Sequence, residues 1–200
     1  MVAEQRNLSK AISRQNFLPQ NNKFMEKSIK NLIKFSLAFF FLQFILTGFA
    51  NAQTEKEIVK IRADVAAINK GAAKYRKKTK AVEDISLEGT EATYYAAGKS
   101  LKKITSKMYG ETFNATGEFY YLDGQLIFAF LKHNRYDTQI GMDKPPKVVS
   151  VEERRFYFAG GDLIRLLVGK KELKSGDERY DELRDGILDT ASKLKNSYEN

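Results

Sequence analysis

The stretch FNATGEFYYLDGQLIFAFL, residues 113–131, decides the fold. Before Asp123-Gly124, small and apolar residues alternate with polar ones, a period of two that is typical of a strand with one buried face. Asp123-Gly124 is a dipeptide that tolerates the positive φ angles of a type I′ hairpin turn. The residues that follow, 126–131, are apolar on both faces, which favours a central strand. The stretch therefore predicts an antiparallel hairpin.

A second hairpin is predicted around Gly160-Gly161, because paired glycines supply the same turn chemistry between two apolar runs. Residues 134–150, between the two hairpins, contain Pro145-Pro146, and paired prolines cannot lie in a central strand. We expect a long loop there. The sheet as a whole is expected over residues 85–169.

Two amphipathic helices are predicted to flank the sheet, at residues 55–78 and 177–198, because each stretch carries a single apolar stripe at helical spacing. The fold class is therefore α+β, an antiparallel β-meander of hairpins with an amphipathic helix at each end of the mature domain. Since both stripes need an apolar surface, we expect both helices to pack on one face of the sheet. The stripes consist of Ile58, Ile61, Val65, Ile68, Ala72 and Tyr75, and of Tyr180, Leu183, Ile187, Ala191, Leu194 and Tyr198.

The segment before this domain, residues 25–52, has the three parts of a secretory signal peptide. Several lysines precede residues 35–49, a run of fifteen residues without a charge, and Ala50-Asn51-Ala52 forms an A-x-A cleavage site. We expect cleavage after Ala52, which would make Gln53 the first residue of the mature chain.

The mature chain would then be a single exported domain, residues 53–200, in the periplasm or outside the cell. The alternative is an inner-membrane anchor in which the segment 35–50 stays uncleaved, although a spanning helix usually needs about 20 apolar residues. A leader counted from Met1 is too long for a signal peptide, whereas one counted from Met25 has ordinary proportions. We therefore expect translation to begin at Met25 and regard residues 1–24 as a doubtful extension.

The formal net charge of +9 suggests a nucleic-acid partner at first sight. Residues 1–52 hold seven basic and two acidic side chains, however, which leaves only +4 for residues 53–200. We therefore expect no nucleic-acid partner, and membrane contact only through the signal segment. The remaining basic run complements the C-terminal dipole of the first helix or, alternatively, binds an anionic envelope polymer or lipid headgroups. It consists of Lys74, Arg76, Lys77, Lys78 and Lys80.

Residues able to perform chemistry are scarce. The chain has no cysteine and one histidine, which excludes a disulfide framework, a thiolate metal site and a cysteine nucleophile. No phosphate-binding loop or nucleophile elbow is present, and we expect no metal or cofactor. His133 lies at the end of a predicted central strand. It is either a structural residue or a general base that works with a carboxylate such as Asp137 or Glu118.

Three segments, residues 93–101, 119–126 and 156–163, share an aromatic pair, a two-residue gap, a glycine and a leucine. The pattern predicts a strand end, a tight turn and a strand start, and the extra residue before the leucine of the first copy predicts a longer turn or a bulge there. It resembles the Y-Y-x-x-G-x-L unit of the MORN-type repeats of bacterial exported proteins, which implies a scaffold or binding surface. The whole domain is also similar to small exported proteins of Bacteroidota.

In each aromatic pair one ring is expected to point to the core and the other away from it. Outward rings at Tyr94, Tyr120 and Tyr157 would form a flat surface for a glycan, a peptide or a partner sheet, unless residues 134–150 cover them. The sequence thus predicts a non-enzymatic, exported binding or structural module, with an envelope protein or anionic polymer as partner. The alternatives are a small envelope hydrolase that uses His133 and a membrane-tethered scaffold.

Overall fold

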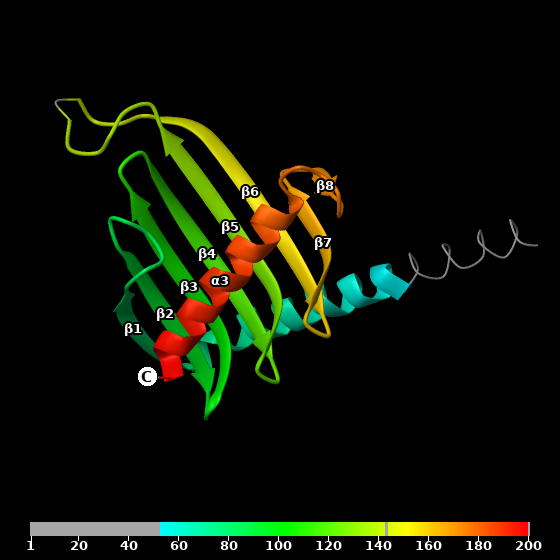
Figure 1. Cartoon of the computed structure of the whole chain (residues 1–200). Coiled ribbons are helices and arrows are strands. Elements are labelled where there is room, and N and C mark those ends of the chain that lie inside the picture. The colour runs from blue at the N-terminus through cyan, green and yellow to red at the C-terminus, as the bar shows by residue number, and fades with distance from the viewer. Residues whose placement is uncertain (1–52, 143, 200) are drawn as a thin grey trace, which may run out of the picture. The chain divides into compact units, whose positions relative to one another are not determined.

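The computed structural model describes residues 53–142 and 144–199. They form one eight-stranded antiparallel sheet in which each strand pairs with its neighbour in sequence, so the predicted α+β meander is confirmed (Figure 1). A helix at residues 53–71, here the leading helix, and the 3-10 helix η1 (Ala72–Lys74) precede the sheet, and α3 (Tyr180–Glu199) follows it. The strands are β1 (Arg76–Val82), β2 (Thr90–Ala97), β3 (Ser100–Gly110), β4 (Phe113–Leu122), β5 (Gln125–Tyr136), β6 (Val148–Ala159), β7 (Asp162–Val168) and β8 (Lys171–Leu173).

The two predicted hairpins, β4–β5 and β6–β7, are both present. Asp123 and Gly124 have φ angles of 50° and 80°, as a type I′ turn requires, and Gly160 and Gly161 have 60° and 94°. Local turn chemistry therefore set these two connections.

The three repeat segments form three hairpins of one design. Their two-residue turns are closed by the pairs Ala97↔Ser100, Leu122↔Gln125 and Ala159↔Asp162. In all three hairpins the register shifts at the same distance from the turn. The shift lies between Tyr95 and Ala96, between Tyr120 and Tyr121, and between Tyr157 and Phe158. For the first copy, where a longer turn or a bulge was predicted, the turn keeps two residues and the strand carries a bulge-type register shift, as it does in every copy. The first copy differs only because its glycine, Gly98, takes the first of the two turn positions.

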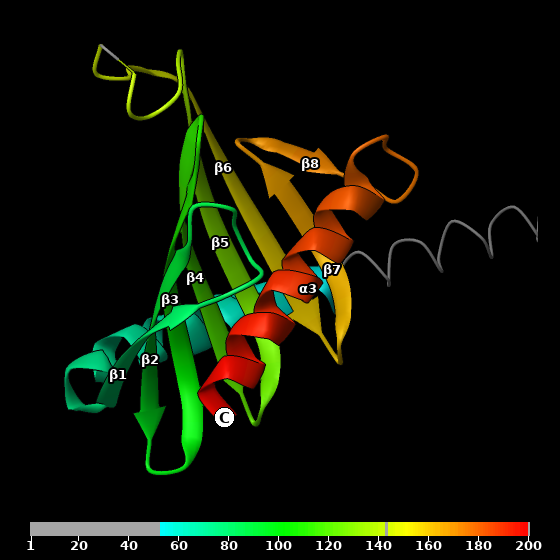
Figure 2. The same ribbon diagram turned by 60° about the vertical axis from the view of Figure 1, so that its left-hand side comes forward.

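One face of the sheet packs against α3 and holds the larger apolar core (Figure 2). Leu183, Ile187, Ala191 and Leu194 form the buried side of α3. Because side chains alternate along a strand, every second residue of the central strands faces this helix. The main sheet residues in this core are Tyr94, Ile104, Phe119, Tyr121, Phe156, Phe158 and Leu166.

The leading helix packs on the opposite face of the sheet, so the prediction that both helices share one face is wrong. Ile58 and Ile61 of this helix pack with Tyr157 of the sheet, and Val65 lies against the same cluster. The physical reason lies in the apolar residues of the central strands, which occur on both faces and therefore need a cover on each side. Partly buried Phe128, Ile164 and Leu167 complete this second core.

The element boundaries also differ from those predicted. The first helix does not extend to residue 78: it ends at residue 71, Tyr75 is extended, and the chain continues as β1. Pairing of β1 with β2 outweighs the helical spacing of the apolar residues in this stretch. The sheet therefore begins before residue 85, and with β8 it continues past residue 169.

The predicted loop over residues 134–150 is shorter than expected. β5 runs to Tyr136 and β6 starts at Val148, so the connection spans residues 137–147, with Pro145-Pro146 inside it. Asp137 and Lys147 close its base: the amide of Asp137 donates to the Lys147 carbonyl at 3.0 Å, and the amide of Lys147 donates to Asp137 Oδ1 at 2.8 Å.

Within residues 53–142 and 144–199, no helix is long and apolar enough to span a membrane. The expectations for the signal peptide, its cleavage site and the uncleaved anchor concern residues 25–52. These residues lie outside the part of the chain that the structure describes.

Candidate functional site

The tyrosines predicted to form an exposed aromatic surface are buried. Tyr94 is 0% exposed on the α3 side, with its ring centroid 5.3 Å from that of Tyr198. Tyr120 and Tyr157 are 1% and 4% exposed on the side of the leading helix. The aromatic platform is therefore not present as predicted, and the cover is the leading helix rather than residues 134–150. The physical reason is that the leading helix covers Tyr157 with its isoleucines and Tyr120 with Asn69, whereas α3 covers Tyr94.

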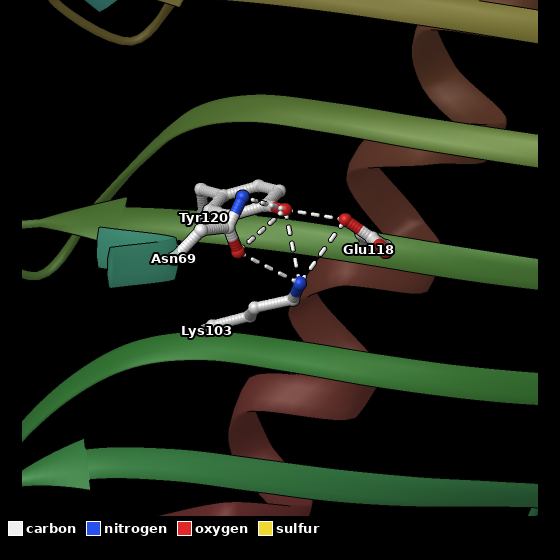
Figure 3. A network of polar contacts seen from close by, with 4 residues as sticks. All are labelled: Asn69, Lys103, Glu118 and Tyr120. Atoms are coloured by element: carbon white, nitrogen blue, oxygen red, sulfur yellow. Dashed lines mark hydrogen bonds and ion pairs between the residues drawn. The ribbon is translucent and has the colours of Figure 1, made fainter. Parts of the chain in front are cut away.

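A partly buried polar network lies where the leading helix ends (Figure 3). The Lys103 ammonium on β3 donates to Asn69 Oδ1 at 3.0 Å, to Glu118 Oε2 at 3.1 Å and to the Tyr120 hydroxyl at 3.0 Å. These three acceptors match the three protons of an ammonium group. The Tyr120 hydroxyl donates in turn to Glu118, and Asn69 Nδ2 donates to that hydroxyl at 3.0 Å. The network therefore links the leading helix to two central strands.

Electrostatics favour one protonation state for Lys103 and one for Tyr120 at neutral pH. Burial by itself would lower the pKa of Lys103, but its hydrogen bonds to Tyr120 and Glu118 and the charge of Glu118 outweigh it, and the pKa is raised. Burial and the bond to Glu118 raise the pKa of Tyr120. Lys103 thus stays charged and Tyr120 stays neutral, so neither is poised as a general base. The arrangement serves to anchor the helix.

His133 lies on the α3 side of β5, opposite Ala115 and Glu152 in the two neighbouring strands. Its ring stacks on Phe113, with centroids 4.8 Å apart. Burial lowers the pKa of His133, with a further contribution from Arg154, so the imidazole is neutral at neutral pH.

The two carboxylates suggested as partners of His133 do not lie with it. Glu118 pairs with Phe130 and points to the opposite face, because residues 130 and 133 alternate across the strand. Asp137 instead closes the β5–β6 loop through the amide of Lys147. The proposed acid–base pairing of His133 with either residue is therefore wrong.

Glu152 is the carboxylate opposite His133, and two arginines hold it. Arg154 Nε donates to Glu152 Oε1 at 2.5 Å, while Arg179 donates to both carboxylate oxygens at 3.0 and 3.1 Å. The Arg179 hydrogen bond is the main cause that lowers the pKa of Glu152 to about 2. This carboxylate is thus a fixed anion that joins β6 to the segment before α3. Arg179 reaches Glu152 only in the folded chain, because the two residues are far apart in sequence. The spacing of Glu152 and Arg154 is the one feature of the sequence that indicates an ion pair here.

The basic run lies mainly on β1, an edge strand, and does not complement the dipole of the leading helix. Lys74 ends η1, and the side chains of Lys77 and Lys78 are exposed. Two other members of the run contact the end of α3 instead. Lys80 Nζ donates to the carbonyl of Ser197 at 2.6 Å, and Arg76 donates to the hydroxyl of Tyr198 at 3.3 Å. A cation at a helix C-terminus is favourable, so Lys80 caps α3.

An open cavity of about 790 Å³ lies at the loop between β1 and β2. Val82, Ile85 and Phe113 give it apolar walls, and Glu83 and Asp84 add carboxylates. His133 is not among its lining residues, although its stacking partner Phe113 is. Within the described ranges, no group of three or more histidine or acidic side chains is placed to hold a metal ion.

The first half of β6 forms an open strand edge that the sequence analysis did not identify. β7 pairs with β6 only from Arg154 onward, and the amide of Gly169 bonds to the Glu153 carbonyl at 2.7 Å where this pairing ends. Among the residues that the structure describes, 148–153 therefore have a strand neighbour on the β5 side alone. The valines at 148, 149 and 151 are 51%, 54% and 53% exposed.

The loop beside this edge adds two more exposed apolar side chains, Ile140 and Met142. Five of the nine exposed large apolar residues of the described chain thus fall within residues 140–151. A run of β-branched residues after paired prolines was the available signal in the sequence. It could not show which side of the strand would stay unpaired.

No protein-family model matches the chain, and neither a curated protein nor a solved structure was found to match it.

Proposed function

We propose that the chain is an exported, non-enzymatic binding module that joins an extended segment of another envelope polypeptide through the open edge of β6. The observation that carries the proposal is the half-exposed valine run at residues 148–151, in the first half of β6, which has no strand neighbour on one side within the described chain. Such an edge presents free backbone donors and acceptors, which an added strand satisfies.

The opposite edge of the sheet supports this assignment by contrast. β1 carries exposed lysines, and lysine on an edge strand discourages pairing with another chain. The edge of β6 at residues 148–151 carries no charge. Valine favours strand pairing through its branched side chain. A partner strand is therefore directed to β6 and away from β1.

The state of the titratable groups favours binding over catalysis. Lys103 is fully hydrogen-bonded and charged, and Glu152 is held by two arginines. His133 faces Glu152 in the register, but its two suggested partners lie elsewhere. Export is supported by the three-part leader at residues 25–52, which is a property of the sequence.

Site-specific photo-crosslinking in intact cells tests the proposal. A photoreactive amino acid at position 149 should give a covalent adduct with another polypeptide, whereas the same residue at position 79, on the β1 edge, should not. Val151→Pro removes a backbone donor from the edge and should abolish the adduct formed at 149. Absence of an adduct at 149, or an adduct that persists in Val151→Pro, would overturn the proposal. Circular dichroism of the purified Val151→Pro variant checks that the sheet is retained.

A further inference from the structure

We infer that a second binding surface lies at the corner of the sheet where β1 meets the β2–β3 turn, and that it binds a flexible, phosphate-bearing polymer. Residues 65–82 hold six basic side chains and no acidic one, and residues 92–110 hold four basic side chains and no acidic one. Because β1 pairs with β2, the fold places these two stretches side by side (Figure 1). The surface is separate from the open edge of β6, so the inference does not depend on the proposed function.

The positive charge of this corner is not compensated by the protein itself. Of the ten basic side chains in the two stretches, Lys103 and Lys107 alone form an ion pair with a carboxylate in the described part of the chain. Partial desolvation lowers the pKa of Lys80, and the nearby charge of Lys78 lowers it further. Such a surface attracts anions, because uncompensated charges of one sign add up to a strong local field.

The exposed lysines of this corner come from three elements. Lys74 ends η1, Lys77 and Lys78 lie on β1, and Lys99 lies in the β2–β3 turn. The first residue of β1 pairs with Ala96, which lies beside that turn. Protection of an edge strand against pairing explains the lysines on β1, but it does not explain those of η1 and the turn. We call these four lysines the basic corner.

The chemistry of the basic corner favours a phosphate-bearing polymer over a lipid surface. A lysine ammonium binds phosphate as a point charge without a fixed geometry, which suits a flexible chain. Lys77 and Lys78 point to opposite faces of the edge strand, so a polymer that follows the edge contacts both, whereas a flat membrane cannot face both. None of the exposed large apolar side chains of the described chain lies within residues 65–82 or 92–108, although binding to a lipid surface usually buries such side chains.

Titration of the purified full chain into end-labelled, long-chain inorganic polyphosphate tests the inference, with fluorescence anisotropy as the readout at several salt concentrations. Lys77→Gln/Lys78→Gln should weaken binding by about tenfold. The slope of log Kd against log salt should fall by about one to two, because two phosphate contacts are lost. Lys170→Gln/Lys171→Gln is the matched control, since these adjacent lysines at the β7–β8 turn are exposed, and it should change the affinity by less than about twofold. Thermal unfolding checks that both variants are folded.

The outcomes separate the polymer from other partners and from the edge of β6. No binding of polyphosphate by the natural chain, or equal losses in the two double variants, would overturn the inference. Phosphatidylglycerol vesicles are the second probe: vesicle binding that requires Lys77 and Lys78 and is not displaced by polyphosphate would identify a lipid surface instead and overturn the polymer. The crosslink expected at position 149 should persist in Lys77→Gln/Lys78→Gln, so the proposed function stands or fails separately.

Discussion

The two faces of the sheet are covered by helices in different ways. The α3 face is closed by an apolar core that runs from Tyr94 to Leu166 across the strands. The leading-helix face has a smaller apolar cluster around Tyr157 and, at its far end, the network centred on Lys103. The comparison teaches that one face is held mainly by the amount of buried apolar area, whereas the other also depends on directed polar bonds.

The largest expected effect comes from Phe119→Ala on the α3 face, because Phe119 is fully buried in the main core. Truncation of a buried phenylalanine leaves a cavity and should cost about 3–5 kcal/mol of unfolding free energy. Denaturant unfolding measures it. Phe128→Ala, the same change at a partly exposed position on the leading-helix face, is the matched control and should cost clearly less. Equal losses would contradict the distinction between the faces.

The next effect is that of Lys103→Met in the polar network. The change leaves Asn69, Glu118 and Tyr120 without their shared donor, and it should cost about 2–3 kcal/mol. Lys107→Met is the matched control on the same strand. The Lys107 ammonium is exposed and lies 4.0 Å from the Glu91 carboxylate, so its loss should change the unfolding free energy by less than about 0.5 kcal/mol. If the two variants were equally stable in denaturant unfolding, the network would not anchor the helix.

A pH effect of intermediate size is expected at Glu152, at the rim of the α3 face. Its pKa is about 2 in the folded chain, below the ordinary 4.5, so its contribution to stability is present above pH 4.5 and is lost as the pH falls toward 2. Glu152→Gln should remove roughly 2 kcal/mol at pH 7, since one pKa unit corresponds to about 1.4 kcal/mol and solvent at Arg179 reduces the full value. Thermal unfolding between pH 2 and 7 should show a flatter profile for this variant. A parallel profile would contradict the assigned ion pairs.

The smallest effect is expected for Asn69→Ala, which removes the contribution of the leading helix to the network. The variant loses the hydrogen bonds of Asn69 to Lys103 and to Tyr120, which should lower the unfolding free energy by about 1 kcal/mol. Amide hydrogen exchange should become faster near the end of this helix while that of α3 stays unchanged. Lys70→Ala, an exposed neighbour, serves as control. Faster exchange in both helices would mean that the two faces are not independently covered.

The features that could be predicted from the sequence are those set by neighbouring residues. Asp123-Gly124 and Gly160-Gly161 define their own turns, and the period-two runs beside them define strands. The stripe at residues 55–78 was misleading past residue 71, because pairing of β1 with β2 decides the structure there. Local pattern is sufficient only where no distant partner competes.

The sites were less predictable, because they arise from residues far apart in the chain. Asn69 and Tyr120 are separated by 51 positions, and no spacing rule connects them. The prediction placed Tyr94, Tyr120 and Tyr157 on one face, but Tyr94 lies on the α3 face and the other two lie under the leading helix. The open edge of β6 depends in turn on where β7 ends.

The strict sequence order of the strands also has a consequence for how the chain folds. Every strand pairs with the next one in sequence, so the sheet can form by closing successive connections. No strand has to pair first with one that is distant in sequence. A chain that emerges amino end first could add hairpins as they appear. The α3 face, however, stays uncovered until residues 180–199 have emerged. Before α3 is in place, the larger apolar core of the sheet is therefore exposed. A chaperone would find its largest apolar binding surface at this stage.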